Sequence, residues 1–186
     1  MKKTLIASLL LGGCFLGSVQ AADYVVDTKG AHASINFKIK HLGYSWLTGR
    51  FNKFDGKFSY DVANISGAKV NINIDTSSID TNHAARNKHI RSDDFLDVSK
   101  FATATFSSTK VEDKGHGKLA ITGDLTLHGV TKSVVIDAVT IGEGKDPWGG
   151  YRAGFTGITS ITMKDFGIDS NFGEVLFELN LEGIRK

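Results

Sequence analysis

The feature that most constrains this chain is a two-residue alternation of apolar and polar side chains. Ala33, Ile35, Phe37 and Ile39 alternate with polar residues, which is the pattern of a β-strand with one apolar face. Alternation, or a high content of Thr, Val, Ile and Phe, predicts further strands at 47–54, 58–62, 70–74, 103–109, 118–127, 133–141, 153–163 and 175–182. About eight such strands must close or stack to bury their apolar faces, so an all-β antiparallel barrel or sandwich is predicted.

One segment interrupts the alternation. Residues 80–91 show no two-residue period and offer capping residues before Ala84 and Ala85. This predicts a short helix, with a second turn that starts at Ser92. The single proline, Pro147, lies in a glycine-rich stretch that predicts a loop. Because the sequence contains no linker, internal repeat or low-complexity run, a single domain is expected.

The N-terminus has the residue order of a secretory signal peptide. Lys2 and Lys3 precede an apolar and small-residue stretch at 5–19, and Val19-Gln20-Ala21 offers a cleavage site. We therefore expect a cleaved signal at 1–21 and a mature exported domain at 22–186.

The N-terminus fits two other kinds of segment less well. A membrane anchor is disfavoured, because the apolar stretch has about 15 residues where a spanning helix needs roughly 20. The second is a lipoprotein box at 11–14, with Cys14 acylated as the mature N-terminus. Its apolar core would be short, and Phe15-Leu16 would follow the cut where a polar tether is usual.

Cleavage changes the charge and the cysteine content of the mature chain. Without Lys2 and Lys3 the 22 basic residues fall to 20, which equals the 20 acidic residues. A formally neutral protein lacks the basic excess that drives binding to nucleic acid or to anionic membranes, so neither nucleic acid nor stable membrane insertion is expected. The single cysteine, Cys14, leaves with the signal, so no disulfide or thiol nucleophile is expected.

Motifs for catalysis or metal binding are weak. Gly43-x-Ser45 lacks the final glycine of a hydrolase elbow, and the histidines are not at the spacing of local ligand pairs. We therefore predict no metal and no cofactor. An enzyme acting on an isoprenoid or amide stays as an alternative, with His41 and Asp55 or His89 and Asp93 as the polar pair.

A basic stripe and several aromatic residues are the remaining candidates for a binding site. The stripe lies on the predicted helix and comprises His83, Arg86 and His89, with Lys88 and Arg91 nearby. Its guanidinium groups can fork onto a phosphate or carboxylate of a ligand. Alternatively, the stripe pairs internally with Asp80, Asp93, Asp94 and Asp97. Most aromatics are expected in the core, and an eight-stranded barrel is either filled by its side chains or holds one small ligand.

The sequence resembles a known family over nearly the whole mature chain. The segments that carry the resemblance are 32–46, 80–96, 123–132 and 146–155. They are similar to the YceI-like periplasmic proteins, also called the polyisoprenoid-binding or lipid-binding family. Ser133 departs from the family pattern, in which proline is expected after Lys132. The resemblance implies a periplasmic, extended lipocalin-like antiparallel barrel with a short helical insertion, a long hydrophobic tunnel for an isoprenoid or other long-chain lipid, and no catalytic residues.

The predicted function is therefore a periplasmic carrier or sequestering protein for a long-chain lipid. The residues expected to contact the lipid tail are Ile35, Phe37, Ile39, Trp46, Phe51, Phe58, Leu125, Leu127, Phe155 and Phe177. The residues expected at the head group are His83, Arg86, His89, Arg91 and Trp148. A structural or stress-protective barrel without a ligand is the main alternative, and a homodimer is left open.

Overall fold

The computed structural model describes residues 21–169 and 172–186. The predicted signal peptide, with Cys14 of the alternative lipoprotein box, lies outside the described residues except for Ala21. The strands are β1 (Ala22–Val26), β2 (Ser34–His41), β3 (Ser45–Phe51), β4 (Phe54–Tyr60), β5 (Lys69–Asp75), β6 (Ile79–Asp80), β7 (Thr103–Gly115), β8 (Lys118–Leu127), β9 (Val130–Lys145), β10 (Tyr151–Thr162) and β11 (Glu174–Arg185). The helical elements are α1 (Ala84–Arg91) and the short 3₁₀ turns η1 (Ile65–Gly67), η2 (Thr76–Ser78) and η3 (Met163–Phe166).

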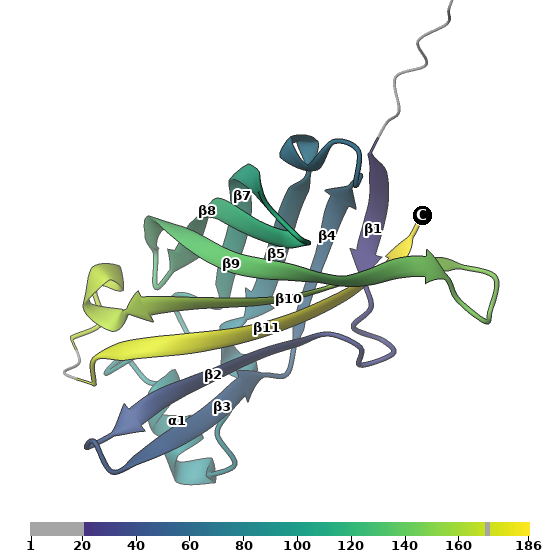
Figure 1. Ribbon diagram of the computed structural model, residues 1–186. Coiled ribbons are helices and arrows are strands. Elements are labelled where there is room, and N and C mark those ends of the chain that lie inside the picture. Colours follow the sequence, from purple (N-terminus) through teal and green to yellow (C-terminus); the bar gives the residue numbers. More distant parts are fainter. Residues whose placement is uncertain (1–20, 170–171) are drawn as a thin grey trace, which may run out of the picture.

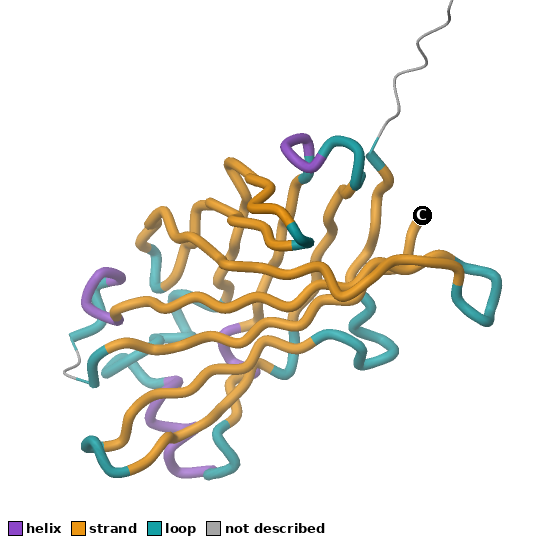
Figure 2. The backbone as a smooth tube through the Cα atoms, viewed as in Figure 1, coloured by secondary structure: helices purple, strands orange, loops and turns teal. Residues whose placement is uncertain are grey.

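The strands form an eight-stranded antiparallel barrel, as the sequence predicts. Neighbours in the wall follow chain order from β7 to β11, and most of the chain is strand (Figures 1 and 2). β1 and β2 pair with successive parts of β11, and they pair in turn with β4 and β3. β1 and β2 together therefore form one interrupted strand of the barrel, and β3 and β4 form a second. β5 and β6 form a third.

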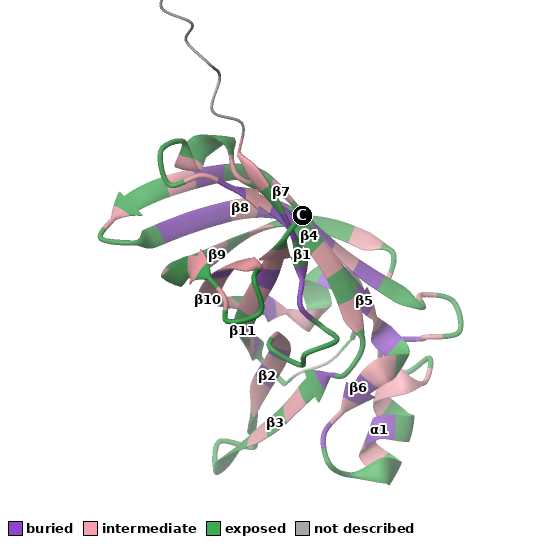
Figure 3. Ribbon diagram, turned by 90° about the vertical axis from the view of Figure 1, so that its right-hand side faces the viewer, coloured by how far each residue is buried: buried purple, intermediate pink, exposed green. Residues whose placement is uncertain are grey.

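Burial explains where the prediction of strands is accurate and where it is not. Along β2, Ile35 and Phe37 are buried and their polar neighbours are less so, whereas a continuous stretch of β8 is buried (Figure 3). The last residues of β9, after Ala138, leave the core and are largely exposed. Because neither face is buried there, the sequence shows no clear alternation, and the strand continues beyond its predicted end at 141. β1 was not predicted.

The predicted helix is present as α1, between β6 and β7. His83 Nδ1 accepts a hydrogen bond from the Arg86 backbone amide at 3.1 Å, which caps the helix. The helix is fixed by buried Asn87, whose Oδ1 accepts from the Thr81 amide at 2.8 Å and whose Nδ2 donates to Asp80 at 2.8 Å. These hydrogen bonds fix α1 to the chain just before it, while Ile90 of the helix packs against the apolar core.

Aromatic side chains pack together inside one end of the barrel. The rings of Tyr24 and Phe58 stack with centroids 4.8 Å apart. Phe155 meets Phe58 edge-on at 5.4 Å and Tyr60 at 5.0 Å. The Phe58 ring also covers Gly183, where an added Cβ would lie 2.4 Å from it. This end is therefore densely packed, and burial raises the pKa of both tyrosines.

A cluster of charged side chains spans the point where β11 changes partner from β2 to β1. Arg152 Nη1 donates to Asp27 at 2.6 Å and also to Glu182, and Arg152 Nε donates to Asp146 at 2.9 Å. His32 Nδ1 lies 3.0 Å from the same Asp27 oxygen. The hydrogen bond from Arg152, with that from the Gly30 amide, holds the pKa of buried Asp27 well below its usual range.

We predict that Arg152→Met lowers the free energy of unfolding at pH 7 by about 3 kcal/mol, because it leaves Asp27 buried without a cation. The same change at exposed Arg50, which bonds Asn52, is the control and is expected to cost less than about 0.5 kcal/mol. Urea unfolding measures both.

The pH dependence gives an independent check on this explanation. In the wild type the folded pKa of Asp27 is depressed, so its contribution is present above about pH 4 and is lost as the pH falls further. In Arg152→Met the main cause that lowers the pKa of Asp27 is removed while its burial, which raises the pKa, remains, so protonation of Asp27 should stabilise this variant. The difference between the two proteins must therefore shrink as the pH falls from 7 to 4, and a constant difference would contradict the role given to Arg152.

Candidate functional site

The barrel encloses a cavity of about 470 Å³. Its lining comes from the inward faces of the strands, from α1 and from the segment after α1, and is almost wholly apolar. The polar residues in the lining are Lys40, His41, Arg86, His89, Thr156 and Thr159. The first four come from the end of β2 and from α1, which lie at the same end of the barrel in Figures 1 and 3. We call this end the mouth.

Nine of the ten residues predicted to contact a lipid tail line the cavity. They are Ile35, Phe37, Ile39, Phe51, Phe58, Leu125, Leu127, Phe155 and Phe177. The Phe37 ring lies between those of Phe51 and Phe177, with centroids 6.0 and 6.2 Å away. An added Cβ on Gly49 would lie 2.3 Å from the same ring, so a glycine on the facing strand makes room for Phe37.

Trp46 must be removed from the predicted tail contacts. On β3 it is Leu47 that lines the cavity, opposite Ile39 of β2. Trp46 faces outward with 47% of its side chain exposed, and the Lys38 and Lys40 ammonium groups lie 5.6 and 5.7 Å from its ring. The alternation of this strand is hard to detect in the sequence, because Gly49 leaves it without an apolar side chain at the inward position after Leu47.

Arg86 and His89 of the basic stripe line the mouth. Arg86 donates from Nε to the Thr81 hydroxyl and from Nη2 to the Thr81 carbonyl, both at 2.8 Å. His89 Nε2 lies 3.1 Å from Asp94, and its ring meets Phe95 edge-on at 4.9 Å. Both side chains are therefore positioned by local partners while they face the cavity.

The structure places the other three predicted head-group residues away from the cavity. His83 caps α1. Arg91 Nη2 donates to the Ile79 carbonyl at 2.8 Å. Trp148 is 76% exposed in the loop between β9 and β10, where its ring stacks over Arg152. Within the described residues, Arg86 and Arg91 thus bond mainly backbone carbonyl groups. Of the four aspartates that could pair with the stripe, Asp94 forms an ion pair with it, through His89.

The polar pairs of the enzyme alternative are not assembled in the described part of the chain. Asp55 accepts a hydrogen bond from Asn73 at 2.8 Å on the outside of the barrel, whereas His41 lies at the mouth. His89 contacts Asp94 rather than Asp93, and both members of that pair are more than half exposed. The arrangement offers no buried acid and base side by side in the cavity.

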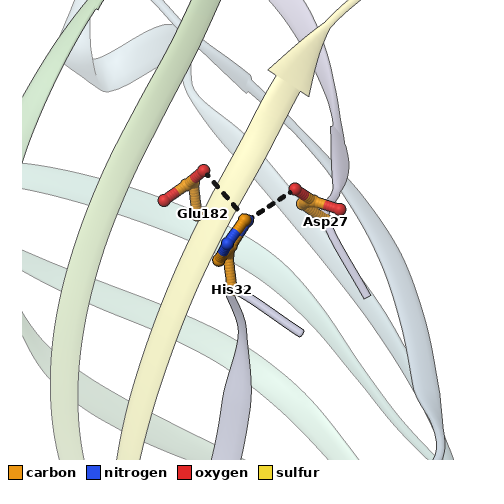
Figure 4. A group of neighbouring side chains, drawn as sticks. All are labelled: Asp27, His32 and Glu182. Atoms are coloured by element: carbon orange, nitrogen blue, oxygen red, sulfur yellow. Dashed lines mark hydrogen bonds and ion pairs between the residues drawn. The ribbon is translucent and has the colours of Figure 1, made fainter. Parts of the chain in front are cut away.

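Asp27, His32 and Glu182 bring three possible metal ligands within 4.8 Å of one another (Figure 4). Arg152 donates to both carboxylates and compensates part of their negative charge. Because a cation of the chain itself lies between these oxygens, the group does not suit a metal ion. Sequence reasoning missed Arg152, although it lies in the segment 146–155 that carries the family resemblance.

Residues 24–182 match the YceI-like domain family. The chain belongs to this family. A UPF0312 protein of Shewanella denitrificans is 61% identical, with 100% of both chains covered. BcnA of Burkholderia cenocepacia has a similar fold, with a TM-score of 0.76, 22% identity and coverage of 84% of this chain and 98% of that one.

A second solved structure of similar fold has a name that describes a function. It is a polyisoprenoid binding domain from Saccharophagus degradans, with a TM-score of 0.64, 16% identity and coverage of 89% of this chain and 99% of that one. At this identity the likeness establishes the fold. Within the described residues, no helix is long and apolar enough to span a membrane.

We predict that Phe37→Arg unfolds the barrel or abolishes uptake of a fluorescent fatty-acid probe, because an unpaired charge in the apolar wall costs several kcal/mol. The control is Asn36→Arg, which places the same charge on the outer face, opposite Glu178 of β11. It should leave the melting temperature and probe uptake close to the wild-type values. Equal tolerance at both positions would show that Phe37 does not face the cavity.

Proposed function

We propose that this YceI-like protein is an exported, periplasmic binding protein that carries or sequesters a long-chain apolar lipid such as a polyisoprenoid. The observation that carries the proposal is the apolar cavity of about 470 Å³ with polar residues gathered at one end. A filled barrel without a ligand would pack these side chains against one another. The polyisoprenoid-binding description of the Saccharophagus domain supports the choice of ligand class.

The size of the cavity limits what the tail can be. Pockets of roughly 300–1,000 Å³ bury a drug-sized ligand, so about 470 Å³ holds a limited length of chain. A longer tail must extend through the mouth or widen the barrel. Each buried CH₂ contributes about 0.8 kcal/mol, but ordering a flexible chain offsets much of the gain. Tail length therefore favours binding without fixing identity, and lipids of similar width should compete.

The mouth supports a ligand with a polar or anionic head group. Arg86 uses Nε and Nη2 for Thr81, and its Nη1 has no hydrogen bond to another described residue. It can therefore donate to a phosphate or carboxylate without releasing its local partner. Lys40, His41 and His89 lie in the same lining. Because binding of this kind needs no bond to be made or broken, we propose a binding protein rather than an enzyme.

Native mass spectrometry of protein purified from cells tests the ligand. We expect a lipid adduct that is lost in Val134→Trp, since Val134 lines the cavity and a larger apolar ring fills it without adding a charge. The variant should stay folded by circular dichroism. The denatured mass should correspond to a mature chain that begins at Ala22. A wild-type protein without any lipid adduct, prepared from the periplasm, would refute the carrier function.

Arg86 and Arg91 allow head-group binding to be separated from structure. Both donate to a backbone carbonyl at 2.8 Å, but Arg86 alone of the two lines the cavity. Arg86→Gln and Arg91→Gln should lower the melting temperature by similar amounts. Arg86→Gln should also weaken a phosphorylated lipid by about tenfold or more relative to a neutral lipid of equal length, as expected for a lost charge-assisted bond. The same selectivity in both variants would assign Arg86 a purely structural role.

A further inference from the structure

The hairpin between β2 and β3 carries exposed apolar side chains beside the mouth. Leu42 is 73%, Tyr44 89% and Trp46 47% exposed. The strand residues that lead into the hairpin, Lys40 and His41, line the cavity. Large apolar side chains gathered on a surface mark an interaction site more often than isolated ones do. In Figure 3 the tip of this hairpin is exposed and stands apart from the barrel wall.

The conformation of the turn does not explain why position 42 is a leucine. The Tyr44 amide donates to the His41 carbonyl at 3.0 Å, which closes a β-turn with Leu42 and Gly43 at its centre. Leu42 and Gly43 both have positive φ, at 52° and 80°. Such a turn favours asparagine, aspartate or glycine at both central positions, and a leucine there is strained. Strain of this kind is often found at functional sites, and here it presents an apolar side chain to solvent.

The charge around the tip is positive. Residues 34–51 contain Lys38, Lys40 and Arg50 and no aspartate or glutamate. The two lysine ammonium groups lie 5.6 and 5.7 Å from the centroid of the Trp46 ring. Lys38 is also paired with Glu178 of β11, whereas Lys40 has no ion pair with any described residue. The neutral net charge of the mature chain therefore hides a local basic and aromatic surface.

We propose that the tip of the β2–β3 hairpin, Leu42, Tyr44 and Trp46, docks on an anionic lipid bilayer and holds the mouth against it. Tyrosine and tryptophan favour the interface between acyl chains and head groups, and lysines near the surface are attracted to anionic lipids. Docking at this end gives an apolar ligand a short path between the bilayer and the cavity, so the inference rests on the proposed carrier function. With only Leu42, Tyr44 and Trp46 to insert, the contact with the bilayer should be shallow and reversible.

The two tryptophans of the chain make the test specific to one end of the barrel. Trp46 belongs to the hairpin, which pairs with β11 near Val175, whereas Trp148 lies in the loop beside Arg152, opposite Ile184. Those two positions of β11 are about 30 Å apart at the rise of an extended strand. Mature Trp148→Phe protein reports on Trp46 alone, and mature Trp46→Phe protein reports on Trp148 alone.

Each protein is mixed with vesicles of phosphatidylcholine, with or without about 30 mol% of the anionic lipid phosphatidylglycerol. We expect the emission of Trp46 to shift to shorter wavelength with the anionic vesicles and to recover at high salt, while the emission of Trp148 stays unchanged. In the Trp148→Phe background, Leu42→Ser with Tyr44→Ser should weaken vesicle affinity about tenfold or more, because two apolar anchors are lost. The matched control is Thr48→Ser, on the same strand and away from the tip.

Three results would overturn the proposal: no shift of Trp46 with anionic vesicles, an equal shift of Trp148, or full vesicle affinity in the double variant. Trp46 that stays in water with vesicles but becomes shielded on adding a periplasmic protein fraction would show a protein partner instead. Native mass spectrometry of the same preparations separates the two proposals. A lipid adduct without docking refutes the docking surface alone, and docking without a lipid adduct refutes the carrier function alone.

Discussion

The structure depends on the way in which the edge of β11 is shared. This edge pairs with β2 over Val175–Asn180 and with β1 over Gly183–Arg185. A barrel without unpaired edges requires both pairings, yet the chain leaves the wall between them. The Asp27 amide continues the β1 ladder by donating to the Glu182 carbonyl at 2.8 Å, and Arg152 joins the side chains of both residues. The apolar interior exists because this junction is closed.

The sequence predicts the fold well because alternation is a local signal. Ile35 and Phe37 reveal their inward face within five residues, and the helical insertion is recognised by the absence of that period. The pairing of strands is a long-range property, so the interruption of the wall at 27–33 could not be predicted. Asp27 and Arg152 are 125 residues apart. Trp46 shows a second limit, because the size of a side chain does not indicate which face of a strand it occupies.

The interior combines a packed end with a hollow one. Tyr24, Phe58, Tyr60 and Phe155 fill one end with ring contacts, and this end, with the charged junction outside it, supplies rigid structure. The hollow part forgoes packing contacts that a filled core would have. A ligand that binds the folded barrel but not the unfolded chain restores some of these packing contacts. It stabilises the fold by about 2.7 kcal/mol when its concentration is a hundred times its Kd. The stability of the protein should therefore rise with any apolar ligand that occupies the cavity.

The position of α1 has a consequence for how such proteins diversify. The detour that contains the helix leaves the wall after β6, at Asp80, and returns before β7, where the Ala102 carbonyl accepts a hydrogen bond from the Thr76 amide at 3.0 Å. Its two ends thus lie close together, and the pairing of β6 with β3 and of β7 with β5 and β8 uses no residue of the detour. Insertions, deletions and substitutions within it can accumulate without shifting the strand register. Evolution can therefore alter the polar residues that α1 contributes to the mouth while the barrel is inherited unchanged.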